Sequence, residues 1–285
     1  MNKLPLPLSP RLPLNWWGLL VRVIAASVML MASNMVRVPL HQLPIAKRDD
    51  AAGIGANAAI FLLTPIVVVI MLWGWMRFVE RRQLRAIGLF DISKILPGIL
   101  GGTAIVVVPM AVGWVFLSLF SEPEAQHDAV PSSGSVGVIV AGVVYVLVRS
   151  YLLQGIPEEL IYRGWLFSTT AQRPIFTVVW TTLAFTIPHL SSSGGQQSTT
   201  DFLLYLVLPL GMAVLAGAMV VWKKSVWWAA GTHGGMHAVM AVLAILFPVA
   251  LDSTAWVILG VTQLATGLAL LAWWSSKRKA LRLLF

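Results

Sequence analysis

Residues 151–167 read Tyr-Leu-Leu-Gln-Gly-Ile-Pro-Glu-Glu-Leu-Ile-Tyr-Arg-Gly-Trp-Leu-Phe, which places two adjacent carboxylates and an arginine in an apolar run. A charge near the centre of a bilayer costs about 2.5–3.5 kcal/mol on insertion scales, so a chain keeps one there only for a reason. On a helix, Glu159 and Arg163 are four residues apart and can pair. Glu158 lies about 100° around the helix from Glu159 and therefore faces a different neighbour.

The composition is that of a membrane protein. Of the 285 residues, 58% are hydrophobic and only 11% are charged, whereas about 25% of the residues in a soluble domain are charged. The chain has no cysteine, which excludes disulfides, thiolate nucleophiles and thiolate metal sites. The net charge of +9 does not indicate nucleic-acid binding, because the basic residues lie in short connections between apolar runs and no nucleic-acid-binding motif is present.

Eight apolar runs are long enough to cross a bilayer, which takes about 20 residues. These runs are residues 15–36, 51–76, 97–120, 136–168, 174–190, 202–222, 226–247 and 255–274. We therefore expect an all-α, polytopic helical membrane protein with about eight transmembrane helices. The run 136–168 would be about 50 Å long as one helix. We expect a break at Gly155 and Pro157, with Pro157 in the first turn of a new helix.

The charges of the connections alternate along the chain. Lys and Arg occur in residues 77–96, in 169–174, at Lys223 and Lys224, and in the tail at Lys277, Arg278, Lys279 and Arg282. The connections 121–135, 191–201 and 248–254 contain neither residue type. The positive-inside rule then predicts that both termini are cytoplasmic, although connection 37–50 departs from the pattern with three cations.

Two further segments are predicted from this orientation. Residues 81–96 mix cations with apolar positions at helical spacing, so we expect them to lie along the inner membrane surface. Arg22 falls near the inner end of the first run, where we expect its side chain to snorkel to the interface.

Histidines interrupt two of the apolar runs. His189 ends the sequence Phe-Thr-Ile-Pro-His, and His233 and His237 are four residues apart in Gly-Thr-His-Gly-Gly-Met-His. A hairpin turn near residue 172 would place Glu158 and His189 at similar depth, each roughly 21–25 Å from the turn at 1.5 Å per residue. On the same scale, His237 is about 20 Å from Lys224, in the basic connection that precedes its run. These side chains are therefore expected to meet.

Together these groups suit the hydrolysis of an amide. A carboxylate and a histidine can hold a water molecule and take its proton. Further hydrogen-bond donors can stabilise the oxyanion that forms at the carbonyl. Glu158 with His189, and His233 with His237, supply these two halves. A lone intramembrane histidine is often only a contact between helices, so the prediction depends on the whole set.

A zinc site is an alternative use of the same four side chains. Histidines four residues apart on a helix are the arrangement that zinc proteases use, and two further ligands would complete the site. Such motifs carry a glutamate directly after the first histidine, where this chain has Gly234. We therefore expect no cofactor and keep zinc as the alternative, held by Glu158, His189, His233 and His237.

Three short motifs carry a resemblance to a known family. The chain resembles the CAAX protease and bacteriocin-processing family, also called Abi, which includes the type II CAAX prenyl endopeptidases. The motifs are Glu158-Glu159-xxx-Arg163, Phe185-xxx-His189 and His233-xxx-His237. The resemblance covers about residues 81–250 and implies an all-helical intramembrane endopeptidase of the glutamate type.

The resemblance also implies a role for each motif. Glu158 and His189 would activate the water, and the third motif would stabilise the oxyanion. Glu159 and Arg163 would hold the site in shape, with Phe185 as further structural support. The family's third motif usually ends in Asn, whereas this one ends in His237. A neutral histidine can still donate a hydrogen bond, so the oxyanion role remains available to His237.

The resulting organisation has three parts. Residues 1–80 are expected to be N-terminal transmembrane spans, residues 81–250 the protease core, and residues 251–285 the last span with a basic tail. The expected partners are the lipid bilayer and a membrane-associated protein or peptide substrate, in a bacterial plasma membrane. A non-enzymatic alternative remains, in which a membrane adaptor or bacteriocin-immunity protein keeps the scaffold and binds a partner.

Overall fold

The computed structural model describes residues 10–120, 135–192 and 194–283, with the side chains of the last helix as far as Arg278. Connection 121–135 and the side chains of Lys279 and Arg282, which helped to predict the orientation, therefore lie almost wholly outside the described residues. Within these ranges the regular elements are all helical, as predicted. Seven of the helices are long and apolar enough to cross a membrane, which makes this a multi-pass integral membrane protein.

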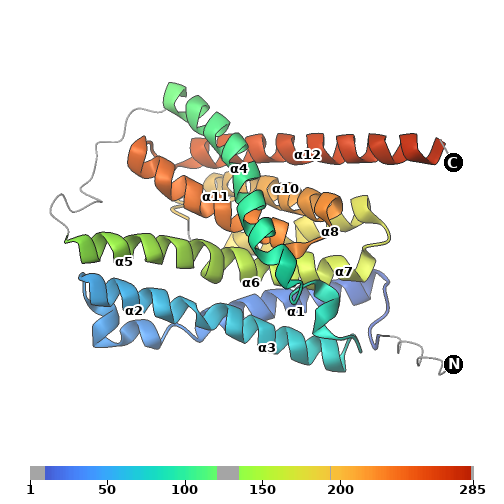
Figure 1. Cartoon of the computed structure of the whole chain (residues 1–285), viewed down its shortest axis with the longest axis horizontal. Helices are drawn as coiled ribbons and strands as arrows, with labels where there is room; N and C mark the ends of the chain where they lie inside the picture. Colours follow the sequence, from blue (N-terminus) through green and yellow to red (C-terminus); the bar gives the residue numbers. More distant parts are fainter. Residues whose placement is uncertain (1–9, 121–134, 193, 284–285) are drawn as a thin grey trace.

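The helices follow the predicted apolar runs closely. They are α1 (Trp16–Met35), α2 (Ala51–Phe61), α3 (Leu63–Phe78), α4 (Ile92–Phe120), α5 (Val136–Leu147), α6 (Ile156–Glu159), α7 (Phe167–Thr170), α8 (Pro174–Thr186), α9 (Thr199–Tyr205), α10 (Val207–Lys223), α11 (Val226–Leu246) and α12 (Ser253–Leu283). Most of them run side by side along the long axis, and α4 crosses them obliquely (Figure 1). The start of α1 and the end of α12 lie at the same end of the bundle (Figure 1). Which face of the membrane that end occupies stays a prediction.

The fourth predicted span does not break at Gly155 and Pro157. Helical structure is continuous from Val136 to Thr170, and two wide, π-helical stretches, η4 (Val148–Gly155) and η5 (Leu160–Leu166), flank α6. Pro157 stands in the first turn of α6, as predicted. Proline lacks the N–H of a regular helical bond, and wide turns are one way in which a helix continues past it. Such turns are frequent at functional sites.

Three other segments differ from the prediction. The second span divides at Leu62 into α2 and α3. The fifth is shorter than expected, because α8 has 13 residues and is followed by a 3-10 helix at Ile187–Ser191. Residues 81–96 do not form one surface helix. They contain a short 3-10 turn, Leu84–Ile87, that ends at the left-handed Gly88 with φ of 79°, after which α4 begins.

Helix α11 lies in the middle of the fold, and α4, η4 and α10 pack against it. Small residues, among them Gly234 and Gly235, let these helices approach closely. A Cβ atom at Gly235 would lie 2.8 Å from the Cα of Thr103 on α4, and one at Gly155 would lie 2.7 Å from the backbone nitrogen of Gly234. Both distances are well inside van der Waals contact, so larger residues would push the helices apart.

Arg22 does not snorkel to the interface. Its side chain is fully buried, and its Nε donates to Oε1 of Glu80 at 2.8 Å while Nη2 donates to Oε2 at 2.9 Å. The prediction was wrong because Glu80 lies 58 residues away in sequence and brings an opposite charge that hydropathy cannot reveal. This pair ties α1 to the end of α3.

Candidate active site

Glu159 forms contacts with several of the buried polar groups. Its Oε1 accepts a hydrogen bond from Nη1 of Arg163 at 3.1 Å, which is the ion pair that the sequence predicted. The same oxygen lies 3.0 Å from Nδ1 of His233 on α11. Nη2 of Arg163 donates to the backbone oxygen of Ala213 on α10 at 2.9 Å. One carboxylate therefore links three helical segments.

Phe185 on α8 is the aromatic residue around which these groups pack. The guanidinium carbon of Arg163 lies 4.7 Å from the centre of its ring. The ring of His233 meets it edge-on at 5.6 Å, and the ring of His189 lies 4.6 Å away. A cation and two imidazoles thus share one aromatic neighbour, and this geometry suits the supporting role predicted for Phe185.

His189 follows α8 in the short 3-10 helix, and its orientation is set by a backbone contact. Its Nδ1 lies 2.8 Å from the carbonyl oxygen of Phe185. A carbonyl oxygen can only accept, so Nδ1 carries the hydrogen. In the neutral ring Nε2 is then an unprotonated acceptor, which is the state that a base needs.

Glu158 precedes Glu159 in the chain, and its orientation away from Glu159 stays a prediction. It is half-buried on α6, and its Oε2 is buried with no hydrogen-bond partner among residues 10–120, 135–192 and 194–283. The ionisable groups near enough to act on its charge include His233 and Arg163. A buried carboxylate oxygen without a partner calls for an explanation, and a water or substrate atom is one.

His237 completes the group of histidines on α11. Its ring lies 5.3 Å from that of His233, at an interplanar angle of 36°. His189 and Arg149 are among the ionisable groups close enough to act on its charge. Arg149 itself is exposed on η4. The three histidines therefore lie within one neighbourhood, although they come from two distant parts of the chain.

Two residues that sequence reasoning missed hold α11 in place. The ring of Tyr151 on η4 packs against Gly234, directly beside His233. Its hydroxyl lies 2.7 Å from Oγ1 of Thr103 on α4. The Thr103 hydroxyl in turn donates to the carbonyl oxygen of Gly231 at 3.1 Å. Tyr151 is the first residue of segment 151–167, so its polar group within an apolar run was a visible signal. Nothing local distinguished Thr103.

The metal alternative receives no geometric support from these side chains. In the described part of the chain, no three His, Asp or Glu residues are grouped in a way that could hold a metal ion. The zinc site of Glu158, His189, His233 and His237 stays an alternative prediction.

The structure brings most of the predicted residues together. Glu159, Arg163 and Phe185 are in direct contact with the histidines or with one another, and Glu158 adjoins them on α6. A carboxylate and imidazoles in one neighbourhood are groups that can bind a water molecule and donate hydrogen bonds to a carbonyl oxygen. The roles assigned to the individual residues stay predictions.

One comparison with known proteins finds a match. Residues 140–239 match the family model described as type II CAAX prenyl endopeptidase Rce1-like. This segment includes all three motifs and lies inside the predicted core of residues 81–250. No curated protein sequence matches the chain.

Proposed function

We propose that this protein, whose residues 140–239 form an Rce1-like type II CAAX prenyl endopeptidase domain, is an intramembrane endopeptidase acting on a membrane-associated protein or peptide. The observation that carries the proposal is the coincidence of that domain with the buried, unpartnered Oε2 of Glu158. The domain supplies the class of reaction, and the free carboxylate oxygen supplies a place for the water.

The proposed first step is the attack of water on the scissile carbonyl carbon. Glu158 takes one proton from the water as the new C–O bond forms. Nε2 of His189 accepts a hydrogen bond from the other water hydrogen, because its Nδ1 is committed to the carbonyl oxygen of Phe185. The water is thereby oriented and made more nucleophilic, a contribution of about 10²–10⁴ in rate.

The oxyanion that forms needs hydrogen-bond donors. Nδ1 of His233 is engaged by Glu159, so His233 can donate to the oxyanion only through Nε2, in its doubly protonated form. His237 can donate as a neutral ring from either nitrogen, which is how it would replace the amide of the Asn that usually ends this motif.

The second step breaks the C–N bond. The tetrahedral intermediate collapses, the bond to nitrogen is lost, and Glu158 returns its proton to the leaving amine. The products are a carboxylic acid, which keeps the second hydrogen of the water, and an amine; proton transfer between them gives a carboxylate and an ammonium group, and the site regains its starting protonation state. Glu159 and Arg163 do not touch the reacting atoms in this scheme but hold His233 in position.

The test compares protein termini in host membranes that contain the wild-type protein or Glu158→Gln at matched expression. We expect new N- and C-termini with the wild type that vanish with the variant. Asp49→Asn is the matched control, because it also removes one carboxylate but from an exposed position. Cleavage by Glu158→Gln at the wild-type rate would refute the proposal.

The same experiment separates the alternatives. If wild type and Glu158→Gln give identical termini and the same cellular phenotype, the adaptor or immunity function is favoured instead. If a chelator abolishes cleavage and about one equivalent of zinc accompanies the purified protein, the zinc-dependent form of the protease is favoured. A bacterial plasma membrane, with both termini in the cytoplasm, is the location that we propose from the charges of the connections.

A further inference from the structure

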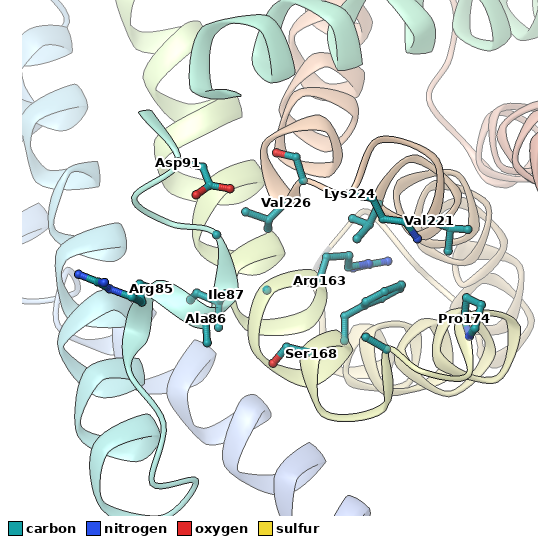
Figure 2. Close-up of a pocket in the computed structure, with 16 residues that line it drawn as sticks. Arg85, Ala86, Ile87, Asp91, Arg163, Ser168, Pro174, Val221, Lys224 and Val226 are labelled. Atoms are coloured by element: carbon teal, nitrogen blue, oxygen red, sulfur yellow. The ribbon is translucent and has the colours of Figure 1, made fainter. Parts of the chain in front are cut away.

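A pocket lies apart from the proposed catalytic residues. It has a volume of about 320 Å³, and it contains none of the three histidines or Glu158 (Figure 2). That volume is at the lower end of the range of about 300–1,000 Å³ that small-molecule sites occupy. Three turns of the chain surround it: residues 85–91 before α4, the turn between α7 and α8, and the turn between α10 and α11. These turns belong to the membrane face that carries the basic connections.

The charge of the lining is positive. Arg85, Arg163 and Lys224 line the pocket, and the one carboxylate among its lining residues is Asp91. Asp91 already accepts a hydrogen bond from Lys94 at 3.0 Å. Lys224 has no carboxylate partner within the described ranges; its Nζ lies 5.5 Å from the ring of Trp274. Burial, together with the nearby charge of Arg278, lowers the pKa of Lys224, as expected where positive charge is uncompensated.

Two helices point their N-termini at the same pocket. Helix α8 begins at Pro174 and α11 begins at Val226, and both residues are part of the lining. The N-terminus of a helix carries partial positive charge and unpaired N–H groups, so it favours anions. Two helix N-termini and a lysine around one cavity therefore all favour the binding of an anion.

Arg163 supplies a buried cation at the inner wall. Its side chain is fully buried, and Nη1 and Nη2 are engaged by Glu159 and Ala213. Its Nε has no partner among the described residues. Figure 2 shows the nitrogen-bearing ends of Arg163 and Lys224 on the same side of the pocket, whereas Arg85 extends outward from the rim. An anion in the pocket would therefore meet one fixed and one adaptable cation.

We propose that this pocket binds the phosphate of an anionic lipid headgroup. The cations and helix N-termini favour a negatively charged ligand. The apolar part of the lining favours a ligand in which the charged group is attached to an apolar one, as in a lipid. That part comprises Ile87, Phe167, Val220, Val221 and Val226. Basic pockets between transmembrane helices are a known type of headgroup site. A free phosphate shares the charge but has no use for the apolar wall.

The experiment titrates the purified full-length protein in neutral detergent with phosphatidylglycerol, phosphatidylcholine or inorganic phosphate. Bound lipid is counted by native mass spectrometry, and the unfolding temperature is followed in parallel. We expect one saturable equivalent of phosphatidylglycerol, and affinity about tenfold weaker in Lys224→Gln, the effect of losing one charged hydrogen bond. Lys277→Gln is the matched control, because it removes a cation beside Trp273, outside the pocket.

The outcomes separate the sources of the anion. Equal weakening by Lys224→Gln and Lys277→Gln, or equal binding of the neutral and the anionic lipid, would overturn the proposal. Stabilisation by inorganic phosphate alone, as strong as that by the lipid, would keep the anion site and exclude the lipid as its source.

A steric variant tests the place of binding without removing a charge. Ala171 and Gln172 are adjacent and exposed, but only Ala171 lines the pocket. We expect Ala171→Trp to abolish the binding of phosphatidylglycerol and Gln172→Trp to leave it intact. Retained binding by Ala171→Trp would refute the assignment to this pocket. Since binding is measured without cleavage, failure here leaves the proposed protease function untouched, and the reverse also holds.

Discussion

Two buried arginine–glutamate pairs occur in the described part of the chain, and they differ in how many of their polar atoms have hydrogen-bond partners. Arg22 and Glu80 form a bidentate pair through Nε and Nη2, at 2.8 and 2.9 Å. The other N–H groups of Arg22 reach backbone carbonyl oxygens, including those of Pro13 at 2.9 Å and Leu12 at 3.0 Å. Every nitrogen of this guanidinium is used.

The carboxylate of that pair is equally well supplied. Oε1 of Glu80 also accepts hydrogen bonds from the indole N–H groups of Trp75 and Trp165, each at 3.2 Å. The network joins α1, the end of α3 and η5. A buried pair with all its lone pairs and protons satisfied avoids most of the desolvation cost and fixes the elements that it joins.

The pair of Arg163 and Glu159 is incomplete by the same measure. One contact of 3.1 Å joins the two side chains, Nε of Arg163 has no partner, and neither has Oε2 of Glu159 within the described ranges. Oε1 of Glu159 is shared with His233 instead. The chain thus leaves polar atoms unsatisfied in one buried place while it satisfies them fully in another.

The difference separates two uses of the same residue types. Unsatisfied buried groups cost about 1–3 kcal/mol each, so each one calls for an explanation, and a functional role is one such explanation. The complete pair, Arg22 and Glu80, is best explained as a structural contact that holds helices together. The incomplete pair, Arg163 and Glu159, is best explained as the support of a site at which ligands bind and protons are transferred.

The largest expected effect comes from removing either arginine. Arg22→Ala and Arg163→Ala each leave a buried carboxylate without its cation, which costs about 3–5 kcal/mol of stability. We expect lower unfolding temperatures and lower yields for both. Cleavage per folded molecule should stay at the wild-type level in Arg22→Ala and fall in Arg163→Ala.

Those two variants test the comparison directly. An equal loss of specific activity in both would show that the pairs do not differ in function. Normal yield and thermal stability of Arg163→Ala would show that Glu159 does not depend on its cation.

A smaller effect is expected from neutralising the carboxylates without changing their size. Glu159→Gln removes the charged acceptor that His233 and Arg163 share, so we expect cleavage per folded molecule to fall by about 10–100-fold, a typical effect of removing a group that orients a working side chain. Glu80→Gln is the matched control and should change the unfolding temperature but not the specific activity. The measurement is the initial rate on a substrate identified by its termini, normalised to folded protein.

The pairs also show what the sequence could and could not predict. Glu159 and Arg163 are four residues apart on one helix, so local geometry alone predicted their contact. The contact of Glu159 with His233 spans 74 residues. It depends on how α11 packs against the fourth span, and no local pattern encodes that packing.

The fold divides in a similar way. Hydropathy predicted the positions of the spans well, because each run must match the thickness of the bilayer by itself. It did not predict that the fourth span would pass Pro157 without a break, because wide turns satisfy the backbone in a way that residue type does not announce. It also treated Arg22 as exposed, since only the folded chain reveals Glu80 beside it.

A still smaller effect is expected for the indoles around Glu80. Trp165→Phe keeps most of the packed ring but removes one hydrogen bond at 3.2 Å, which is worth about 1 kcal/mol. We expect a modest fall in the unfolding temperature and unchanged specific activity. When Glu80→Gln is already present, Trp165→Phe should lower the unfolding temperature by less, because the charged acceptor is gone. Equal costs in both backgrounds would mean that the indole contributes by packing alone.

The smallest effect concerns pH, and it depends on the charge of Glu80. Burial opposes the ionisation of Glu80, yet the hydrogen bonds and charge of Arg22, with the two indoles, hold its pKa below the ordinary value of 4.5. A carboxyl group with a lowered pKa in the folded state adds stability above its unfolded pKa, and that stability is lost as the pH falls through the folded pKa. We expect the unfolding temperature to fall as the pH drops below about 4.5, the unfolded value, and to fall less steeply in Glu80→Gln. The same slope in both proteins would mean that other carboxylates cause the acid sensitivity and that the pair of Arg22 and Glu80 does not hold a charge on Glu80.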